Sequence, residues 1–240
     1  MKQIQKQMLA NHTDFLYYLA AMVVCYLIGD VLAVVLMNVD QEEGFAPMGF
    51  LLALLITGMM LFISISMGMT MEFNMAIRFQ RTRKQFFLSY LAEKLVYILL
   101  YLLAVFLLFL LEQAVLSVVL PQSRSQMFDE MMGFFGALDW WCYPALILCF
   151  LGISMLLGSI VLKMGTKGTV VWVVAWILIC LGPIRLSDLD PSQLQGTVFG
   201  DALSLWTGIG LSGQAAVIAL VGIAGILLSW LMVRRQRVTE

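Results

Sequence analysis

Six long apolar runs constrain the fold of this chain more than any other feature. A helix needs about 20 apolar residues to cross about 30 Å of membrane hydrocarbon. The fifth run is the weakest, because its clean apolar part is only about 15 residues, or roughly 22 Å of helix, and it ends at the stop signal Gly182-Pro183. The runs predict an all-α integral membrane protein with six transmembrane helices in one domain over 1–240, at residues 15–37, 48–70, 95–120, 140–162, 169–183 and 211–233.

Composition agrees with that class and excludes several others. The 240 residues are 62% hydrophobic and 12% charged, whereas soluble domains have about 25% charged residues. A net charge of −1 gives no overall basic field for nucleic acid. The first apolar run spans 23 residues, which is longer than the core of a signal peptide, so we expect it to be retained. All four cysteines lie in apolar runs without a CxxC, so neither disulfides nor a metal site are expected.

The basic residues predict an orientation. Lys and Arg collect on the cytoplasmic side of membrane proteins. If the N-terminus is inside, 12 of the 14 basic residues lie inside, and only Arg124 and Arg185 lie outside. We therefore expect both termini to be cytoplasmic. The inner residues are Lys2, Lys6, Arg78, Arg81, Arg83, Lys84, Lys94, Lys163, Lys167, Arg234, Arg235 and Arg237.

Motifs for hydrolytic enzymes are missing from the sequence. It contains no G-x-x-x-x-G-K-[ST] for ATP and no H-E-x-x-H for zinc. The only histidine is His12, which precedes the first run and is poorly placed for a serine–histidine pair. The pair Glu42-Glu43 has no histidine motif after it to hold a metal. The chain is not expected to be an enzyme by itself.

Two acids lie within the apolar runs and mark a possible substrate path. Asp30 lies in the first run, where a carboxylate costs about 2.5–3.5 kcal/mol and should face protein or water. No Lys or Arg lies within any of the six runs. Asp30 is therefore protonated, hydrogen-bonded to groups such as Ser64 or Ser66, or reached by an outer-loop arginine; a purely structural contact is the alternative. Glu112 lies near the outer end of the third run, where it is expected to be hydrated.

Methionines at the end of the second run raise the question of copper. Met67, Met71 and Met75 recur every four residues and would form one ridge on a helix. Thioethers bind Cu(I), but the alternate residues Met67, Met69 and Met71 point in different directions, and no His or Cys lies nearby. We expect these flexible side chains to fill packing gaps instead.

The last outer segment, 184–206, contains signals for a short helix. Asp190, Pro191 and Gln193 suit the N-cap, first and capping-box positions. After a short fifth run, this helix either dips back into the membrane or lies on the surface. Small residues such as Ser154, Gly158 and those of the sixth run permit close helix packing within the chain or between two copies.

The inner connection carries a family resemblance. The stretch "MEFNMAIRFQRTRKQFFLSYLAEKLVYILL", residues 71–100, resembles the inner loop of ABC-2-type permeases, the membrane subunits of bacterial ABC exporters. The amphipathic lead-in 1–14, the six spans and the short fifth span are similar to that family too. The family's glycine before "TRK" corresponds to Gln80 or Arg81 here. From Met71 to Lys94 there is room for a short helix along the inner surface, a turn and entry to the third span.

The resemblance implies a function and partners. A cytoplasmic coupling segment, 71–94, would dock on an ATP-binding subunit, of which two copies bind ATP and magnesium. A second permease, the same or similar, would complete a multi-pass assembly in the bacterial cytoplasmic membrane, in contact with lipids and not with nucleic acid. This chain would bind no cofactor. The coupling residues implied are Glu72, Arg78, Arg81, Arg83, Lys84, Phe86 and Phe87.

Two other functions fit the composition. An ion- or proton-coupled secondary transporter would use Asp30 and Glu112 as relay groups, although the paired repeats common in such folds are not found. A non-transporting membrane scaffold or immunity protein would tolerate an apolar residue at Asp30. Retention by anionic lipids, at about 1 kcal/mol per basic residue, also explains the inner charge. The substrate stays open.

Overall fold

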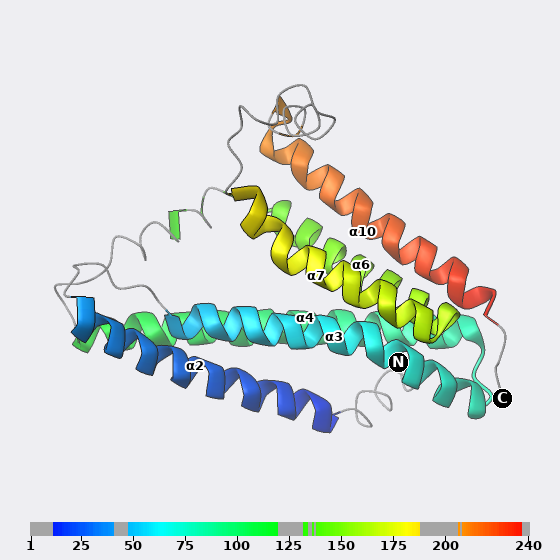
Figure 1. Ribbon diagram of the computed structural model, residues 1–240, viewed down its shortest axis with the longest axis horizontal. Helices are drawn as coiled ribbons and strands as arrows, with labels where there is room; N and C mark the ends of the chain where they lie inside the picture. The colour runs from blue at the N-terminus through cyan, green and yellow to red at the C-terminus, as the bar shows by residue number, and fades with distance from the viewer. Residues whose placement is uncertain are drawn as a thin grey trace. The chain divides into compact units, whose positions relative to one another are not determined.

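The computed structural model is all-helical over the residues it describes, with no strand among them (Figure 1). These residues are 12–40, 48–119, 132–133, 136, 138–187, 206 and 208–236, without the side chains of 12, 14, 36–40, 116–119 and 179–187. The lead-in 1–14, apart from its last residues, and most of the outer segment 184–206 lie outside this description. The helices are α2 (His12–Asp40), α3 (Met48–Arg78), α4 (Arg83–Val119), α6 (Cys142–Met164), α7 (Thr166–Ser187) and α10 (Leu211–Arg234).

Each predicted run lies within one of these helices or nearly coincides with it. Five of the six are long and apolar enough to cross a membrane: parts or all of α2, α3, α4, α6 and α10. In α7 the described apolar stretch, Thr166–Leu178, is shorter. The fifth run was expected to end at Gly182-Pro183, but α7 continues to Ser187. Pro183 removes only one backbone N–H from the helix. Inside a membrane the other backbone N–H and C=O groups must still form hydrogen bonds, and continuing the helix provides them.

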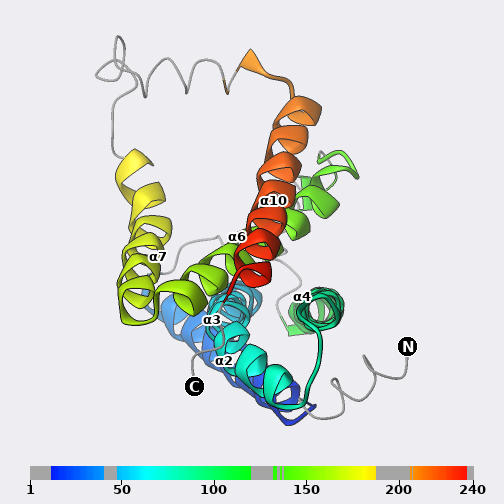
Figure 2. The ribbon, with the colours of Figure 1, turned by 90° about the vertical axis from the view of Figure 1, so that its right-hand side faces the viewer.

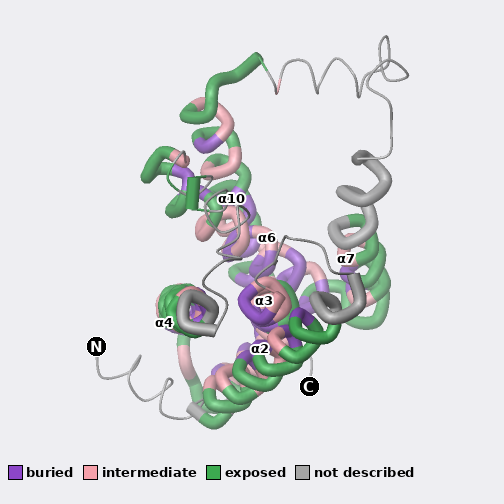
Figure 3. The backbone as a smooth tube through the Cα atoms, turned by 90° about the vertical axis from the view of Figure 1, so that its left-hand side faces the viewer, coloured by how far each residue is buried: buried purple, intermediate pink, exposed green. Residues whose placement is uncertain are grey.

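The outward faces of these helices are apolar, as in proteins surrounded by lipid. Side chains such as Val31 on α2, Leu103 on α4 and Leu220 on α10 are more than half exposed. Figure 3 shows exposed positions running along α2, α4 and α10. Together with five helices of membrane-spanning length, this indicates a multi-pass membrane protein.

The chain forms two compact units, and α3 and α4 each contribute to both. One unit comprises Met1–Ser64 and Leu88–Ala137, and the other comprises Ile65–Phe87 and Leu138–Glu240. Because the chain divides into two units, the single transmembrane domain over 1–240 stays a prediction.

In the first unit, α2 meets the start of α3 through two glycines. A Cβ placed on Gly29 would lie 2.5 Å from the Cα of Gly49, so the backbones approach more closely than any side chain allows. Helix α4 packs on the same part of α3. The rings of Phe50 and Phe109 meet edge to face at 5.0 Å, and the Tyr101 hydroxyl donates to the Leu54 carbonyl at 2.6 Å.

In the second unit, α6 packs against α10 along small residues (Figure 2). A Cβ on Gly152 would lie 2.8 Å from the Cα of Gly222, and one on Gly225 would lie 2.7 Å from the Gly152 carbonyl oxygen. The buried Ser229 hydroxyl donates to the Met155 carbonyl at 3.1 Å. The small residues noted in the sequence therefore bring two helices of this chain together.

The same unit holds the end of α3 against α6 and α7. A Cβ on Gly158 of α6 would lie 2.6 Å from the backbone oxygen of Ser66. The Trp172 indole of α7 donates to the Ser66 hydroxyl at 2.8 Å. Gly165, with φ +57°, forms the tight turn between α6 and α7, and this backbone conformation favours glycine.

The inner connection folds differently from the expected surface helix. Helix α3 continues without a break to Arg78, and α4 begins at Arg83. At 31 and 37 residues these helices are about 46 and 56 Å long, well beyond about 30 Å of hydrocarbon. The polar residues in the last turns of α3 therefore belong to a continuation of the membrane-spanning helix beyond the hydrocarbon, and not to a separate surface helix. The connection is a turn of four residues.

Candidate functional site

The turn between α3 and α4 is closed by a capping box. The Gln85 N–H donates to the Thr82 hydroxyl at 3.3 Å, and the Thr82 N–H donates to the Gln85 side chain at 3.4 Å. This reciprocal pair satisfies donors that the first turn of a helix otherwise leaves open. The Thr-x-x-Gln spacing is a signal in the sequence for the start of α4.

Gln80 has the unusual backbone of this turn. Its φ is +56°, and it is the one non-glycine residue with positive φ among the described residues. For an L-residue this region costs roughly 1–2 kcal/mol, a cost that glycine avoids.

The basic residues of the turn have different surroundings. Arg83 donates to the Arg234 carbonyl at the end of α10, at 2.8 Å, where a cation is favourable. Arg81 is half-buried and has contacts within the protein. Arg78 and Lys84 are exposed. Lys84 lies in the first turn of α4, where the helix dipole opposes a positive charge by about 0.3–1 kcal/mol, so its charge does not serve helix stability.

Phe86 and Phe87 are buried and join the turn to its neighbours. Phe86 meets Phe73 of α3 edge to face at 5.4 Å, and Phe87 packs on Trp230 of α10 at 5.2 Å. They cannot face a partner directly. Instead, their rings join the turn to α3 and α10. Glu72 is half-buried on α3 and also has contacts within the protein.

An exposed apolar ridge lies beside the basic residues. Met71, Met75 and Phe79 follow one another at four-residue spacing on α3 and are 71, 51 and 78% exposed, whereas Met69 is buried. The expectation that the methionines fill packing gaps thus fits Met69 but not Met71 or Met75. The four-residue spacing places these methionines on one face of the helix, but it does not indicate whether that face packs against the protein. We call Met71, Met75, Arg78, Phe79 and Lys84 the turn surface.

Asp30 and Glu112, far apart in the sequence, come together in the first unit. One Glu112 carboxylate oxygen accepts the Phe50 N–H at 2.8 Å, at the start of α3. The carboxyl of Asp30 lies against Gly49 and within reach of Glu112 and the Tyr26 hydroxyl. Glu112 is only 2% exposed, so the expectation of a hydrated side chain is wrong. Of the alternatives considered for Asp30, a hydrogen bond to Ser64 or Ser66 is not what the structure shows, because its neighbours are Tyr26 and Glu112.

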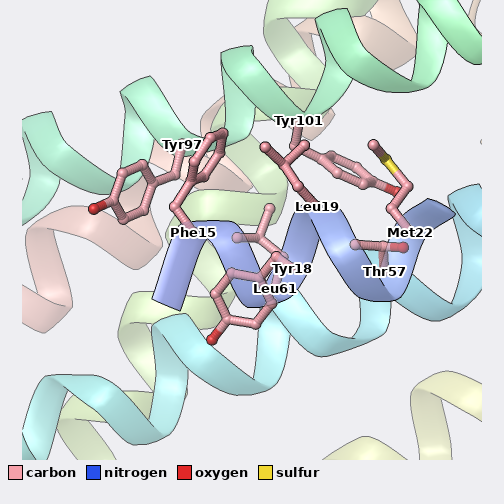
Figure 4. A pocket seen from close by; sticks show the side chains of 8 residues that line it. All are labelled: Phe15, Tyr18, Leu19, Met22, Thr57, Leu61, Tyr97 and Tyr101. Atoms are coloured by element: carbon pink, nitrogen blue, oxygen red, sulfur yellow. The ribbon is translucent and has the colours of Figure 1, made fainter. Parts of the chain in front are cut away.

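A small apolar cavity lies between α2, α3 and α4 (Figure 4). It is lined by Phe15, Tyr18, Leu19, Met22, Thr57, Leu61, Tyr97 and Tyr101. Its volume of about 10 Å³ is barely enough for one water. This cavity is therefore too small to hold a substrate.

Helix α4 also contains a buried ion pair that the apolar pattern did not predict. Glu93 and Lys94 are adjacent and buried, with Lys94 Nζ 3.2 Å from the Glu93 carboxylate. Lys94 also lies over the rings of Tyr90 and Tyr97, at 4.8 and 5.4 Å. The positive charge of Lys94 was used only to predict the orientation of the chain in the membrane. The Tyr-x-x-x-Lys-x-x-Tyr spacing is the signal that could have found this cage.

Comparisons with family models, curated proteins and solved structures found no match for this chain. The resemblance of residues 71–100 therefore stays a prediction from the sequence. Among the described residues there is also no group of three or more His, Cys, Asp or Glu side chains that could hold a metal ion.

Proposed function

We propose that this chain is the membrane permease subunit of a bacterial ABC exporter of the ABC-2 type. The observation that carries the proposal is the turn surface. Two helices longer than the membrane requires end in a tight turn whose exposed side chains are both basic and apolar. Retention of the turn by anionic lipids would explain its basic residues, but it would not explain the exposed apolar side chains of Phe79 and Met71 beside them. A mixed surface of this kind suits a protein partner.

Two further features support a coupling role. Gln80 has a positive φ, a backbone conformation that glycine adopts most easily. This conformation would explain why ABC-2-type permeases often have a glycine at the corresponding position. The hydrogen bond of Arg83 to the end of α10 and the packing of Phe87 on Trp230 would give a route by which a push on the turn reaches α10. Phe86 and Phe87 would then transmit force, while Arg78 and Lys84 would make the contact.

The assembly follows from the resemblance. Two ATP-binding subunits with ATP and magnesium would drive transport, and this chain would pair with a copy of itself or a similar permease. It would cross the cytoplasmic membrane six times, with α7 as the fifth span and both termini inside. Closure of the ATP-binding subunits would move the turns and open a path outward, for a substrate that stays open.

Co-purification tests the proposal. The full chain is captured from its native membranes and the eluate analysed by mass spectrometry and for ATP hydrolysis. We expect a chain with the G-x-x-x-x-G-K-[ST] motif. Arg78→Glu with Lys84→Glu should release it, because both side chains are exposed. Arg235→Glu, an exposed residue at the end of α10, is the matched charge control. Absence of an ATPase, or equal retention in all variants, would overturn the proposal.

A proton-coupled secondary transporter is the second candidate, because the structure brings Asp30 and Glu112 together. The chain alone, reconstituted in liposomes that contain a pH-sensitive dye, decides between the two. Proton flux without any ATPase, lost in Asp30→Asn, would favour the second candidate. A chain that neither moves protons nor binds an ATPase would fit the scaffold or immunity function.

A further inference from the structure

The carboxyls at the start of α3 lack one hydrogen-bond donor. One oxygen of Glu112 accepts the Phe50 N–H, and the Gly49 N–H lies beside the same carboxyl. The other oxygen, Oε1, is fully buried and has no hydrogen-bond partner among the described residues. The carboxyl within its reach belongs to Asp30, which as a carboxylate is also only an acceptor. Two acceptors therefore face each other.

The neighbouring groups that the structure describes do not supply the missing charge. Among these residues, the groups facing the pair are Tyr26 from α2 and the backbone of Gly49 and Phe50 from α3. The helix N-terminus carries only about half an elementary positive charge, which cannot balance two carboxylates. No Lys, Arg or His occurs in 15–37, 48–70 or 95–120. Two neighbouring carboxylates, one of them fully buried, do not both stay ionised without a compensating charge.

A metal ion suits this place poorly. Calcium and magnesium take six or more oxygen ligands, and the donor set here is two carboxyls and one phenol. A proton needs only the two facing oxygens. The close contact of Gly29 with Gly49 also leaves Asp30 against the α3 backbone, with little space for a larger cation.

We propose that Asp30 and Glu112 bind one proton between them and thereby form a proton-binding site that joins α2 to α4 at the start of α3. The proton turns one acceptor into a donor, so that a carboxylic acid of one residue donates to the carboxylate of the other. Glu112 still accepts the Phe50 N–H. The site does not depend on the exporter proposal, because it concerns binding in the resting chain and not transport.

Infrared spectroscopy of the purified full chain in lipid nanodiscs tests this. At neutral pH, we expect a carbonyl band of one protonated carboxyl per chain, which shifts in heavy water. Exposed acids are ionised at that pH and do not contribute. Glu112→Gln and Asp30→Asn should each abolish the band, because an amide then supplies the donor. Asp139→Asn, which is exposed, and Glu93→Gln, whose partner is Lys94, should leave it unchanged.

Thermal unfolding against pH gives a second readout. The wild-type chain should lose stability at alkaline pH as the shared proton leaves and two charges face each other. Glu112→Gln should show less of this loss, because its amide is a permanent donor. Should one variant fail to fold, the other still decides. The proposal is overturned if the wild type lacks the band, if both substitutions leave the band intact, or if the pH profiles of wild type and variant are parallel. Pairing of Asp30 with Arg124 would remove the band from the wild type.

Discussion

At the scale of single residues, Glu112 shows how one side chain can serve two helices. Its carboxylate belongs to α4 but caps the start of α3 through the Phe50 N–H. A capping carboxylate forms a charge-assisted bond with donors that the helix cannot satisfy internally. This bond stabilises an acid that lies near the outer end of an apolar run and has no basic partner among the described residues.

Removing the Glu112 carboxyl should destabilise the protein. Glu112→Ala leaves the Phe50 N–H buried without its acceptor, and loss of a bond to a charged group costs about 1.5–3 kcal/mol. Glu112→Gln retains an acceptor oxygen and should cost less. Unfolding in a detergent series measures both. Equal losses in the two variants would mean that the cap contributes little.

Gln80 offers the opposite case, a residue whose replacement should help. Gln80→Gly removes the unfavourable left-handed conformation, and we expect a gain of about 1 kcal/mol. Gln80→Ala, which has the same backbone restriction, should change stability little and serves as the control. A melting temperature that rises for both variants, or for neither, would contradict this explanation.

At the scale of helices, packing depends on backbones that approach closely. Helices α6 and α10 meet at Gly152, Gly222 and Gly225, as expected where dispersion replaces the hydrophobic driving force inside a membrane. A polar bond such as that of Ser229 to the Met155 carbonyl contributes less, because interhelical hydrogen bonds in membranes average about 0.6 kcal/mol.

This difference in magnitude gives a third prediction. Gly152→Val should separate α6 from α10 and abolish the folded species on size-exclusion chromatography, since the added atoms overlap the Gly222 backbone. Ser229→Ala should cost only about 0.6 kcal/mol and retain it. A well-folded Gly152→Val variant would show that these helices can move apart at small cost.

At the scale of the whole molecule, the question is how the chain crosses the membrane. Five helices are long enough to span it, and α7 is apolar but has a shorter described apolar stretch. The basic residues favour cytoplasmic ends and a cytoplasmic α3–α4 turn. Only a chain with an even number of spans places both termini on one side, so the orientation depends on α7.

Cysteine labelling in intact cells tests this topology. In a chain with its native cysteines replaced, we expect Lys84→Cys and Lys167→Cys to be protected from a membrane-impermeant maleimide, and Trp140→Cys to react. All three positions are exposed on the protein, so protection reports the side of the membrane. If α7 does not cross, Lys84 and Trp140 keep these results, but the C-terminal Arg235→Cys becomes reactive.

The sequence alone determined the helical class, the positions of the helices and most of their ends, because twenty apolar residues in a row have one stable form in lipid. It also placed Asp30, Glu112 and the basic turn residues among the candidates. Tertiary structure decided which faces are buried. It put Glu112 under the start of α3, buried Phe86 and Phe87, left Met71 exposed and extended α3 through the inner connection. These outcomes depend on contacts between residues far apart along the chain, which apolar periodicity does not record.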